Sequence, residues 1–283
     1  MAAPWRLALL GDPVARSLSP RMQAAALAAA GLDGAYEALR TTAAELPARL
    51  TDLRRAGYRG LNLTAPLKEA AWRLAAVKGP IAAVAPDAEV LGAVNTLVPA
   101  AGGDAWEAHN TDLAGFRAAA RALCGSLSGR RVALIGAGGA ARAAALALAE
   151  AGAESIAVWN RGAPRRRALA MLVYGLVAVT ELASDGERLP GGLDLVVQAT
   201  SLGLAAGDPL PPLPAADERP FALDLATGPT PWQERCRAAG CPTADGRVML
   251  LEQGAAAFAL WTGRDAPRAA MRRALGLDPA PPE

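Results

Sequence analysis

Short apolar runs in the second half of the chain alternate with longer stretches rich in alanine and leucine. A short apolar run between turn residues is typical of a buried strand, whereas the longer stretches favour helices. The pattern predicts strands at 131–135, 155–159, 194–198 and 221–225, with helices or loops between them. Such alternation is typical of an α/β domain, in which crossover helices cover a parallel sheet.

The first half of the chain has a less regular pattern, in which polar turns separate the apolar segments. Residues 5–10 predict a strand that the turn Gly11-Asp-Pro closes. Ser19-Pro20 predicts a helix with Ser19 as its N-cap, because serine is a preferred cap and proline suits the first turn. Further elements are expected as a strand at 58–64, a helix after Pro66 that runs to Ala76, a hairpin of 93–98 with 105–108, and a helix from 112 toward 123.

The last part of the chain combines an irregular segment with two helical ones. Residues 207–220 are rich in proline and predict a loop without regular structure. Residues 249–261 and 266–275 predict two helices.

Composition narrows the range of functions. The 283 residues are enough for two domains of ordinary size, and no apolar run reaches the length of a membrane span. A net charge of +2 with both signs interspersed argues against nucleic acid as a partner. Three scattered cysteines and one histidine favour neither a disulfide framework nor a metal site. With no secretory signal at the start, we expect a cytoplasmic protein without a membrane partner.

A glycine-rich turn follows the predicted strand at 131–135. In Gly136-x-Gly138-x-x-Ala141, the first glycine allows a tight turn, the second lets a diphosphate approach the backbone, and the small alanine lets the next helix pack closely. The free N–H groups at the start of that helix favour an anion. The position of the turn between strand and helix therefore indicates a dinucleotide site.

The end of the next strand indicates which dinucleotide is bound. An enzyme that uses NAD would usually carry Asp or Glu there, whereas this chain has Asn160-Arg161. A guanidinium can bind a 2′-phosphate through two parallel hydrogen bonds, so Arg161 favours NADP. The nearby Arg165–Arg167 can equally form a solvated helix face.

Several polar residues upstream of the glycine turn stand where apolar packing does not explain them. Asn62 and Thr64 alternate with leucines and so share one face of a strand, and Lys68 follows shortly after. Other members of this polar set are Ser17, Ser19, Asn95, Asn110, Thr111 and Asp112.

The order of these motifs resembles the shikimate dehydrogenase family over nearly the whole chain. The matching segments are Gly11-Asp-Pro-Val-Ala-Arg-Ser17-Leu-Ser19-Pro, Asn62-Leu-Thr64-Ala-Pro-Leu-Lys68-Glu, Gly92-Ala-Val-Asn95-Thr, Asn110-Thr111-Asp112, Gly136-Ala-Gly-Gly-Ala-Ala-Arg142, Asn160-Arg161, and Ala244-Asp-Gly246 through Met249-Leu-Leu-Glu-Gln253. The resemblance implies reversible, NADP-dependent oxidation of shikimate to 3-dehydroshikimate, a step of chorismate and aromatic amino acid biosynthesis.

The resemblance also implies roles for individual residues. Lys68 and Asp112 would be catalytic, with Lys68 as acid/base and Asp112 as its partner. Substrate would be bound by Ser17, Ser19, Asn62, Thr64, Asn95 and Gln253. The cofactor would be bound by Gly136, Ala137, Gly138, Gly139, Ala140, Asn160, Arg161, Arg165, Thr200, Gly246 and Met249.

The same residues also have ordinary structural interpretations. Asp112 can be a helix cap, Lys68 an exposed lysine of a first helical turn, and Asn95 a turn residue. Gln253 can be a surface helix residue. The ordered set favours the catalytic interpretation of Lys68 and Asp112. His109 is assigned no functional role.

Four positions depart from the family pattern. Arg16 stands where histidine is usual, Gly162 replaces a threonine, and Gln198 replaces an asparagine. The fourth is Thr227, which stands where the family usually has a substrate-facing tyrosine. Loss of that phenol would weaken or reshape one wall of the substrate pocket, which leaves quinate or a related acid as an alternative substrate.

Together these observations predict an α/β protein with two domains. Residues 1–112 would form the substrate domain, 113–246 a Rossmann-type NADP domain, and 247–283 helices that pack on the substrate domain. The alternatives are a paralogue that prefers quinate or NAD and a dinucleotide-binding regulator without catalysis. The sequence is compatible with a monomer or a homodimer.

Overall fold

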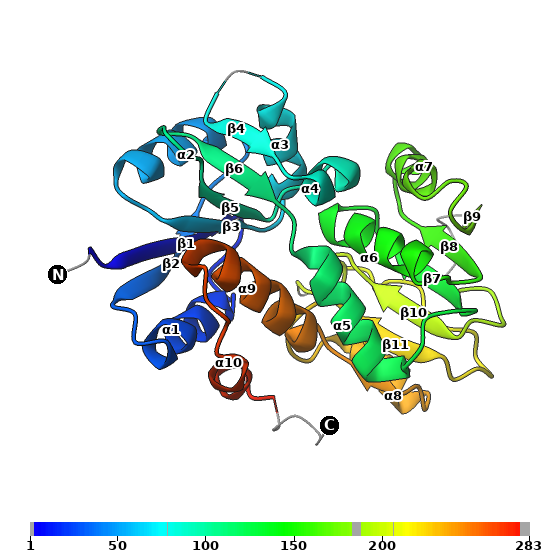
Figure 1. The fold of residues 1–283 in the computed structure, drawn as a ribbon. Coiled ribbons are helices and arrows are strands. Elements are labelled where there is room, and N and C mark those ends of the chain that lie inside the picture. Colours follow the sequence, from blue (N-terminus) through cyan, green and yellow to red (C-terminus); the bar gives the residue numbers. More distant parts are fainter. Residues whose placement is uncertain (1–2, 78, 183–187, 206, 278–283) are drawn as a thin grey trace. The chain divides into compact units, whose positions relative to one another are not determined.

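A computed structural model describes residues 3–77, 79–182, 188–205 and 207–277 of the chain (Figure 1). The chain divides into two compact units. One is formed by the described residues up to Thr111 together with those from Leu251 onward, and the other is Asp112–Leu250.

The first unit is built on a mixed sheet in the order β2-β1-β3-β5-β6-β4. Its strands are β1 (Trp5–Gly11), β2 (Gly34–Arg40), β3 (Gly60–Leu63), β4 (Ile81–Val84), β5 (Thr96–Pro99) and β6 (Trp106–His109). β1 pairs in parallel with β2 and β3, while β5 runs antiparallel to both β3 and β6. Asn62 is directly opposite Thr96 in the β3–β5 ladder. The sheet therefore brings together polar residues that are far apart in the sequence.

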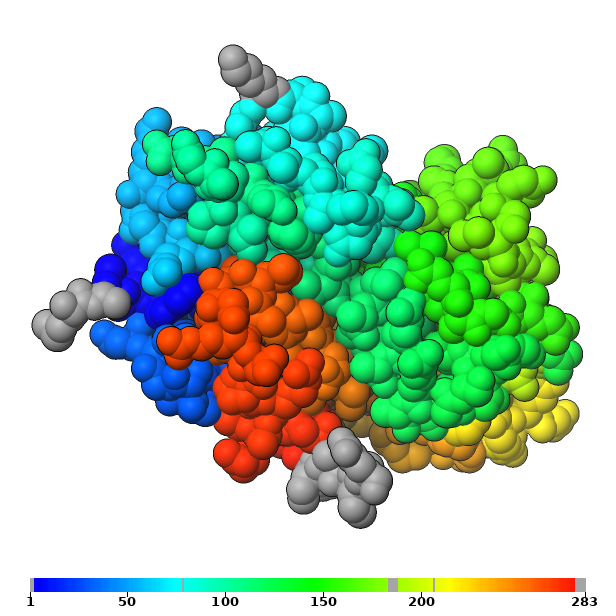
Figure 2. Space-filling view, in the orientation of Figure 1, coloured from blue at the N-terminus to red at the C-terminus, as the bar shows by residue number. Residues whose placement is uncertain are grey.

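Helices cover this sheet and bury its apolar side chains. They are α1 (Ser19–Ala29), α2 (Leu46–Arg55), α3 (Leu67–Ala75), α4 (Pro86–Leu91), the part of α9 (Arg247–Thr262) from Leu251 onward, and α10 (Arg268–Ala274). α10 packs beside α1, as the red and blue segments of Figure 2 show. Trp261 of α9 lies over β3 and donates its indole N–H to the Leu97 carbonyl at 3.1 Å. The end of the chain is thus part of the first unit.

The second unit contains a parallel sheet in the order β12-β11-β10-β7-β8-β9. Its strands are β7 (Arg131–Ile135), β8 (Ser155–Trp159), β9 (Ala178–Glu181), β10 (Leu195–Gln198), β11 (Phe221–Asp224) and β12 (Thr243–Ala244). Its helices are α5 (Asp112–Cys124), α6 (Gly139–Glu150), α7 (Ala163–Leu172) and α8 (Pro231–Ala238). The strand order reverses between β7 and β10, and such a switch point is where doubly wound sheets bind ligands.

Both faces of this sheet are buried, which explains the continuous apolar runs in its strands. Val132 and Leu134 of β7 belong to one core cluster, and Ala133 and Ile135 belong to another. α5 and α6 pack side by side over one face of the sheet (Figure 1). The predicted fold class, an α/β protein with a Rossmann-type parallel sheet, is confirmed.

Some of the predicted elements are confirmed and others need correction. The strands near 5–10, 131–135, 155–159, 194–198 and 221–225 are present, as are the hairpin and the irregular loop at 207–220. The predicted cap was wrong. α1 begins at Ser19 itself, the N-cap position is Leu18, and the Ser19 backbone N–H is bonded to Oγ of Ser17 at 3.2 Å. The Ser17 hydroxyl therefore stabilises the start of α1, and the N-cap residue Leu18 makes no side-chain cap bond.

Candidate functional site

A buried network of amides and hydroxyls lies between β3, β5 and the end of β6. Asn62 donates from Nδ2 to the Asn95 carbonyl at 3.1 Å and to Oγ1 of Thr96 at 3.0 Å. Oδ1 of Asn95 accepts from Oγ1 of Thr96 at 2.9 Å and from the Thr111 backbone N–H at 2.8 Å. All four residues are buried. The network holds the predicted substrate residues Asn62 and Asn95 in fixed orientations.

Tyr36 of β2 belongs to the same network, although no sequence motif includes it. Its hydroxyl donates to Oδ1 of Asn62 at 2.9 Å, and its ring centroid lies 6.1 Å from that of Trp261. Burial raises the pKa of Tyr36, and a hydrogen bond with Ser19 opposes that rise. The phenol therefore stays protonated and links Ser19 to Asn62. Its strand was missed because β2 buries Tyr36 but leaves most of its other side chains exposed.

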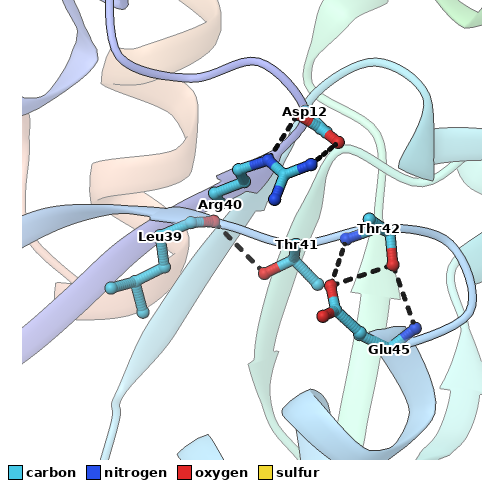
Figure 3. A network of polar contacts seen from close by, with 6 residues as sticks. All are labelled: Asp12, Leu39, Arg40, Thr41, Thr42 and Glu45. Carbon is cyan, nitrogen blue, oxygen red and sulfur yellow. Dashed lines mark hydrogen bonds and ion pairs between the residues drawn. The ribbon is translucent and has the colours of Figure 1, made fainter.

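The loop that carries Ser17 and Ser19 is anchored at its start (Figure 3). Asp12 accepts two hydrogen bonds from the Arg40 guanidinium, at 2.9 and 3.0 Å. The Asp12 backbone N–H donates to the Ala65 carbonyl at 3.0 Å. Further along the loop, the Ser17 hydroxyl donates a hydrogen bond to Oγ of Ser19 at 3.2 Å. These contacts place the serine loop beside the segment that carries Thr64.

Glu45 orders the chain that follows Arg40. Its Oε2 accepts from the Thr42 backbone N–H at 2.8 Å and from Oγ1 of Thr42 at 2.9 Å (Figure 3). The hydrogen bonds from Thr42 lower the pKa of Glu45. The Thr41 backbone N–H donates to the Gly11 carbonyl at 3.0 Å, so this segment is held against the start of the serine loop.

Lys68 and Gln253 both contact the short segment that ends in Asn95. Lys68 is partly buried in the first turn of α3, and its carbonyl accepts from the Val94 backbone N–H at 2.9 Å. Oε1 of Gln253 accepts from Nδ2 of Asn95 at 3.4 Å. The first unit therefore contains the predicted substrate-binding residues and the predicted acid/base, which are Ser17, Ser19, Asn62, Thr64, Asn95, Gln253 and Lys68.

Asp112 is the first residue of α5 and is only 3% exposed. It follows Thr111 directly in sequence and is the first residue of the second unit. His109, to which no role was assigned, lies with Nε2 3.1 Å from Glu107. Burial of a carboxylate is costly unless its charge is compensated.

The glycine turn lies at the switch point, between β7 and α6. Gly136 has a φ of +116°, and a Cβ there would lie 2.9 Å from the Ala199 carbonyl oxygen. A Cβ on Gly138 would have no neighbour within 4 Å. α6 begins at Gly139, so Ala137, Gly138 and Ala140 surround a helix N-terminus. One glycine is required by the fold, while the other leaves open space where a diphosphate would lie.

Thr200 lies beyond the neighbouring strand β10 and is fixed by Gln198. The Thr200 backbone N–H donates to Oε1 of Gln198 at 2.6 Å, and Nε2 of Gln198 donates back to the Thr200 carbonyl at 3.2 Å. The glutamine that departs from the family pattern therefore closes the turn after β10 through both ends of its amide.

The end of β8 presents the predicted cofactor residues Asn160 and Arg161. Nδ2 of Asn160 donates to the Gly162 carbonyl at 3.0 Å. Arg161 is exposed, and no hydrogen bond or ion pair joins it to the rest of the described chain. Arg165 is also exposed, whereas Arg166 is partly buried and pairs with Glu181 at 3.0 Å. Of the three consecutive arginines, Arg166 alone is partly buried, while Arg165 and Arg167 are exposed.

The loop after β11 has no tyrosine and closes around Asp224. Oδ2 of Asp224 accepts from Oγ1 of Thr230 at 2.7 Å, and Oδ1 accepts from the Ala226 backbone N–H at 3.0 Å. Burial raises the pKa of Asp224, which the hydrogen bond from Ala226 opposes. Thr227 itself is exposed, and it takes no part in the bonds to Asp224.

Gly246 lies beside this loop, and Met249 follows it in α9. A Cβ on Gly246 would lie 2.2 Å from the Leu225 carbonyl oxygen, and the Gly246 backbone N–H donates to the Ala226 carbonyl at 2.8 Å. Met249 is buried in the core of the second unit. The second unit therefore contains all the predicted cofactor residues, with Gly246 fixed by close backbone contact.

Two features are absent from the described ranges. No group of three or more metal-ligating side chains is found within residues 3–77, 79–182, 188–205 and 207–277. Across the same part of the chain, every helix is too short or too polar to cross a membrane.

Sequence models of known families match most of the chain. The shikimate dehydrogenase substrate binding domain matches residues 9–97, shikimate/quinate 5-dehydrogenase matches 118–205, and the shikimate 5′-dehydrogenase C-terminal domain matches 246–275. A shikimate dehydrogenase (NADP(+)) from Thermus thermophilus is 45% identical over 281 residues, which cover 96% of this chain and 99% of that protein. The chain belongs to the shikimate dehydrogenase family. The resemblance inferred from the motifs is confirmed.

Solved structures of similar fold include proteins named for different activities. Shikimate 5-dehydrogenase of Thermus thermophilus in complex with NADP(H) and shikimate has a TM-score of 0.80 and 39% identity, covering 96% of this chain and 98% of that one. The ligand-free 5-ketofructose reductase of a Gluconobacter strain also has a TM-score of 0.80, with 31% identity and coverage of 97% and 98%.

Proposed function

We propose that this protein is an NADP-dependent shikimate dehydrogenase, which interconverts shikimate and 3-dehydroshikimate in aromatic amino acid biosynthesis. The observation that carries the proposal is the 45% identity, over nearly the whole chain, to a relative named for this reaction. The segments that match the three family models also include every predicted site residue except Asp112.

In this proposal the two units bind different molecules. The first unit would bind the substrate through Ser17, Ser19, Asn62, Thr64, Asn95 and Gln253. The second would bind NADP through Gly136, Ala137, Gly138, Gly139, Ala140, Asn160, Arg161, Arg165, Thr200, Gly246 and Met249. A buried set of amides and hydroxyls suits a ring with several hydroxyls, because an analogue that lacks one leaves a buried polar group without its partner.

The residues at the cofactor site fit NADP. The open space at Gly138 leaves room for a diphosphate beside the N-terminus of α6. Arg161 at the end of β8 suits a 2′-phosphate, which a carboxylate at this position would repel. Bound NADP⁺ would supply the acceptor for the hydride that leaves the alcohol carbon.

A side chain of the protein must transfer the proton. Oxidation of a secondary alcohol removes a proton from the hydroxyl oxygen together with the hydride from carbon. We assign this proton transfer to Lys68 and Asp112. The Lys68 amine takes the proton in oxidation and returns it in reduction, as a general base and acid.

A second candidate is the same reaction on a different cyclic acid, such as quinate, or with NAD. The observation that favours it is the loop after β11, which carries Thr227 and no phenol. The structural likeness to a ketose reductase supports the view that this fold accepts more than one substrate. A regulator without catalysis is disfavoured, because binding alone does not require Lys68 and Asp112.

Initial rates with four substrate–cofactor pairs test the proposal. Purified protein is given shikimate or quinate with NADP⁺ or NAD⁺, and reduced nicotinamide is followed by its absorbance. The proposal predicts the highest kcat/KM for shikimate with NADP⁺. A higher value for quinate supports the second candidate, and binding without turnover for any pair supports the regulator.

We also propose a cytoplasmic location and a monomeric or homodimeric state. Light scattering during size-exclusion chromatography distinguishes the two states, and a larger assembly would contradict both.

A further inference from the structure

Arg166 makes contacts that neither neighbouring arginine makes. Its Nε donates to Oε2 of Glu181 at 3.0 Å, and its Nη1 donates to the Asn160 carbonyl at 3.1 Å. Its side chain is 15% exposed, whereas that of Arg167 is 80% exposed. The guanidinium therefore spans two fixed acceptors in a mostly buried setting.

The two acceptors belong to parts of the fold that flank the candidate phosphate site. Asn160 follows β8 and immediately precedes Arg161, while Glu181 ends β9 and pairs in register with Val158 of β8. Arg166 lies in the first turns of α7, and its backbone N–H donates to the Gly162 carbonyl at 3.2 Å. The side chain thus folds back over the turn between β8 and α7.

This arrangement limits the motion of Arg161. The Asn160 carbonyl and the Arg161 nitrogen belong to one rigid peptide unit, so fixing the carbonyl also fixes the direction in which Arg161 leaves the strand. Gly162, which follows, has no side chain to restrain the turn and makes no side-chain cap bond as the N-cap of α7. Arg166 and the Asn160 amide each make a side-chain hydrogen bond that restrains this turn.

Arg167 offers a natural comparison. It pairs with the same carboxylate, Glu181, at 3.8 Å, but within the described part of the chain no side-chain hydrogen bond or ion pair joins it to the turn that carries Arg161. Loss of either arginine removes one positive charge from this region. Only loss of Arg166 removes the contact with Asn160.

We propose that Arg166 is a positioning residue for recognition of the cofactor's 2′-phosphate, because it fixes the Asn160–Arg161 peptide against Glu181. The inference rests on the proposed use of NADP. It assigns to Arg166 no direct contact with the cofactor, and it separates Arg166 from the two arginines, Arg161 and Arg165, that are proposed to bind it.

Three variants separate positioning from simple charge. Arg166→Ala removes both contacts and the charge. Arg166→Lys keeps the charge, but a single ammonium cannot span the two acceptors as a planar guanidinium does. Arg167→Ala removes a matched charge beside the same Glu181. The measurements are KM and kcat with NADP⁺ and with NAD⁺, together with the binding of adenosine 2′,5′-bisphosphate and of adenosine monophosphate.

Positioning predicts that Arg166→Ala and Arg166→Lys each raise the KM for NADP⁺ about tenfold, since a charge-assisted hydrogen bond at the phosphate is lost or misdirected. The KM for NAD⁺ and both kcat values stay close to those of the wild type, and only the bisphosphate binds more weakly. Arg167→Ala behaves like the wild type. Thermal unfolding of each variant without ligand shows whether a change in KM comes from loss of folded protein.

Other outcomes overturn the inference in distinguishable ways. If Arg166→Lys keeps the wild-type preference for NADP⁺ and Arg167→Ala loses it, charge alone explains the effect and positioning is wrong. If all three variants keep the preference, Arg166 serves the fold only. If the wild type itself shows no preference for NADP⁺, the proposed cofactor fails and the inference fails with it.

Discussion

The hydroxyl of Tyr36 donates a hydrogen bond to Oδ1 of Asn62 at 2.9 Å, and both residues are buried. With Oδ1 engaged in this way, Nδ2 of Asn62 is directed to Asn95 and Thr96. Tyr36 thus sets the orientation of an amide at the centre of the candidate substrate site. It has this effect from β2, a strand that contributes none of the motif residues.

Replacing Tyr36 with Phe should weaken substrate binding without unfolding the protein. The ring and its packing against Trp261 remain, but the Asn62 amide loses the partner that orients it. A buried acceptor left unpaired costs about 1–3 kcal/mol, so we expect the KM for shikimate to rise about tenfold. The KM for NADP⁺ should not change.

Tyr58→Phe is the matched control. Tyr58 also lies in the first unit, but its hydroxyl contacts Glu37 and Arg6, away from the network of Asn62. Steady-state kinetics should give wild-type KM values for this variant. Equal effects of the two substitutions would show that Tyr36 has no special role at the site.

The two glycines of the turn after β7 should respond differently to alanine. Gly138→Ala is compatible with the fold, because its backbone is extended and a Cβ there meets nothing within 4 Å. The methyl group would fill the space proposed for the diphosphate, so the KM for NADP⁺ should rise about tenfold or more at unchanged melting temperature.

Gly136→Ala should instead lower the melting temperature. Its φ of +116° is unfavourable for alanine, and its Cβ would press on the Ala199 carbonyl. Strain of this kind costs about 1–3 kcal/mol. Calorimetry without ligand checks both variants, and a destabilised Gly138→Ala protein would contradict the account of the turn.

Gly60→Ala should destabilise the first unit. A Cβ at Gly60 would lie 2.3 Å from Cδ1 of Trp261, whose ring is held by its hydrogen bond to Leu97. Overpacking of this kind usually lowers the free energy of unfolding by about 1–3 kcal/mol. Gly103→Ala, where a Cβ meets nothing within 4 Å, is the control for urea denaturation. Similar midpoints for the two variants would refute the predicted clash.

The cysteines should be inert in the native protein. Cys124, Cys236 and Cys241 are free and buried, and burial raises the pKa of Cys236 to about 12. Burial also raises the pKa of Cys124 and of Cys241. Because the thiolate is the reactive form, an aromatic disulfide reagent at about pH 8 should react slowly with the native protein and rapidly in urea. Rapid reaction of a native thiol would contradict this burial.

The sequence allowed prediction of those features that depend on local pattern. Val132–Ile135 read as an apolar run because helices cover both faces of their sheet, and Gly136 and Gly138 could be interpreted from the strand and helix beside them. β2 was missed because its pattern of buried and exposed residues does not alternate regularly. β12 has only two residues, too few for a periodic signal.

Features that depend on tertiary pairing could not be predicted. Tyr36 reaches Asn62 only because β2, β1 and β3 are neighbours in the sheet. In the same way, nothing in the run Arg165–Arg167 indicates that Arg166 pairs with Glu181 and Asn160, since Glu181 becomes its neighbour only when β9 pairs with β8.

In the proposed mechanism, this chain oxidises shikimate with NADP⁺ through Lys68. The test is to give shikimate and NADP⁺ to the wild-type protein and to Lys68→Ala, and to measure how fast the absorbance of reduced nicotinamide rises. Lys78→Ala, which removes the chain's other lysine, is the control. Loss of an acid/base group should slow turnover by about 10²–10⁴-fold, with the control unchanged. An inactive wild type, or a Lys68→Ala protein as fast as the wild type, would contradict the claim.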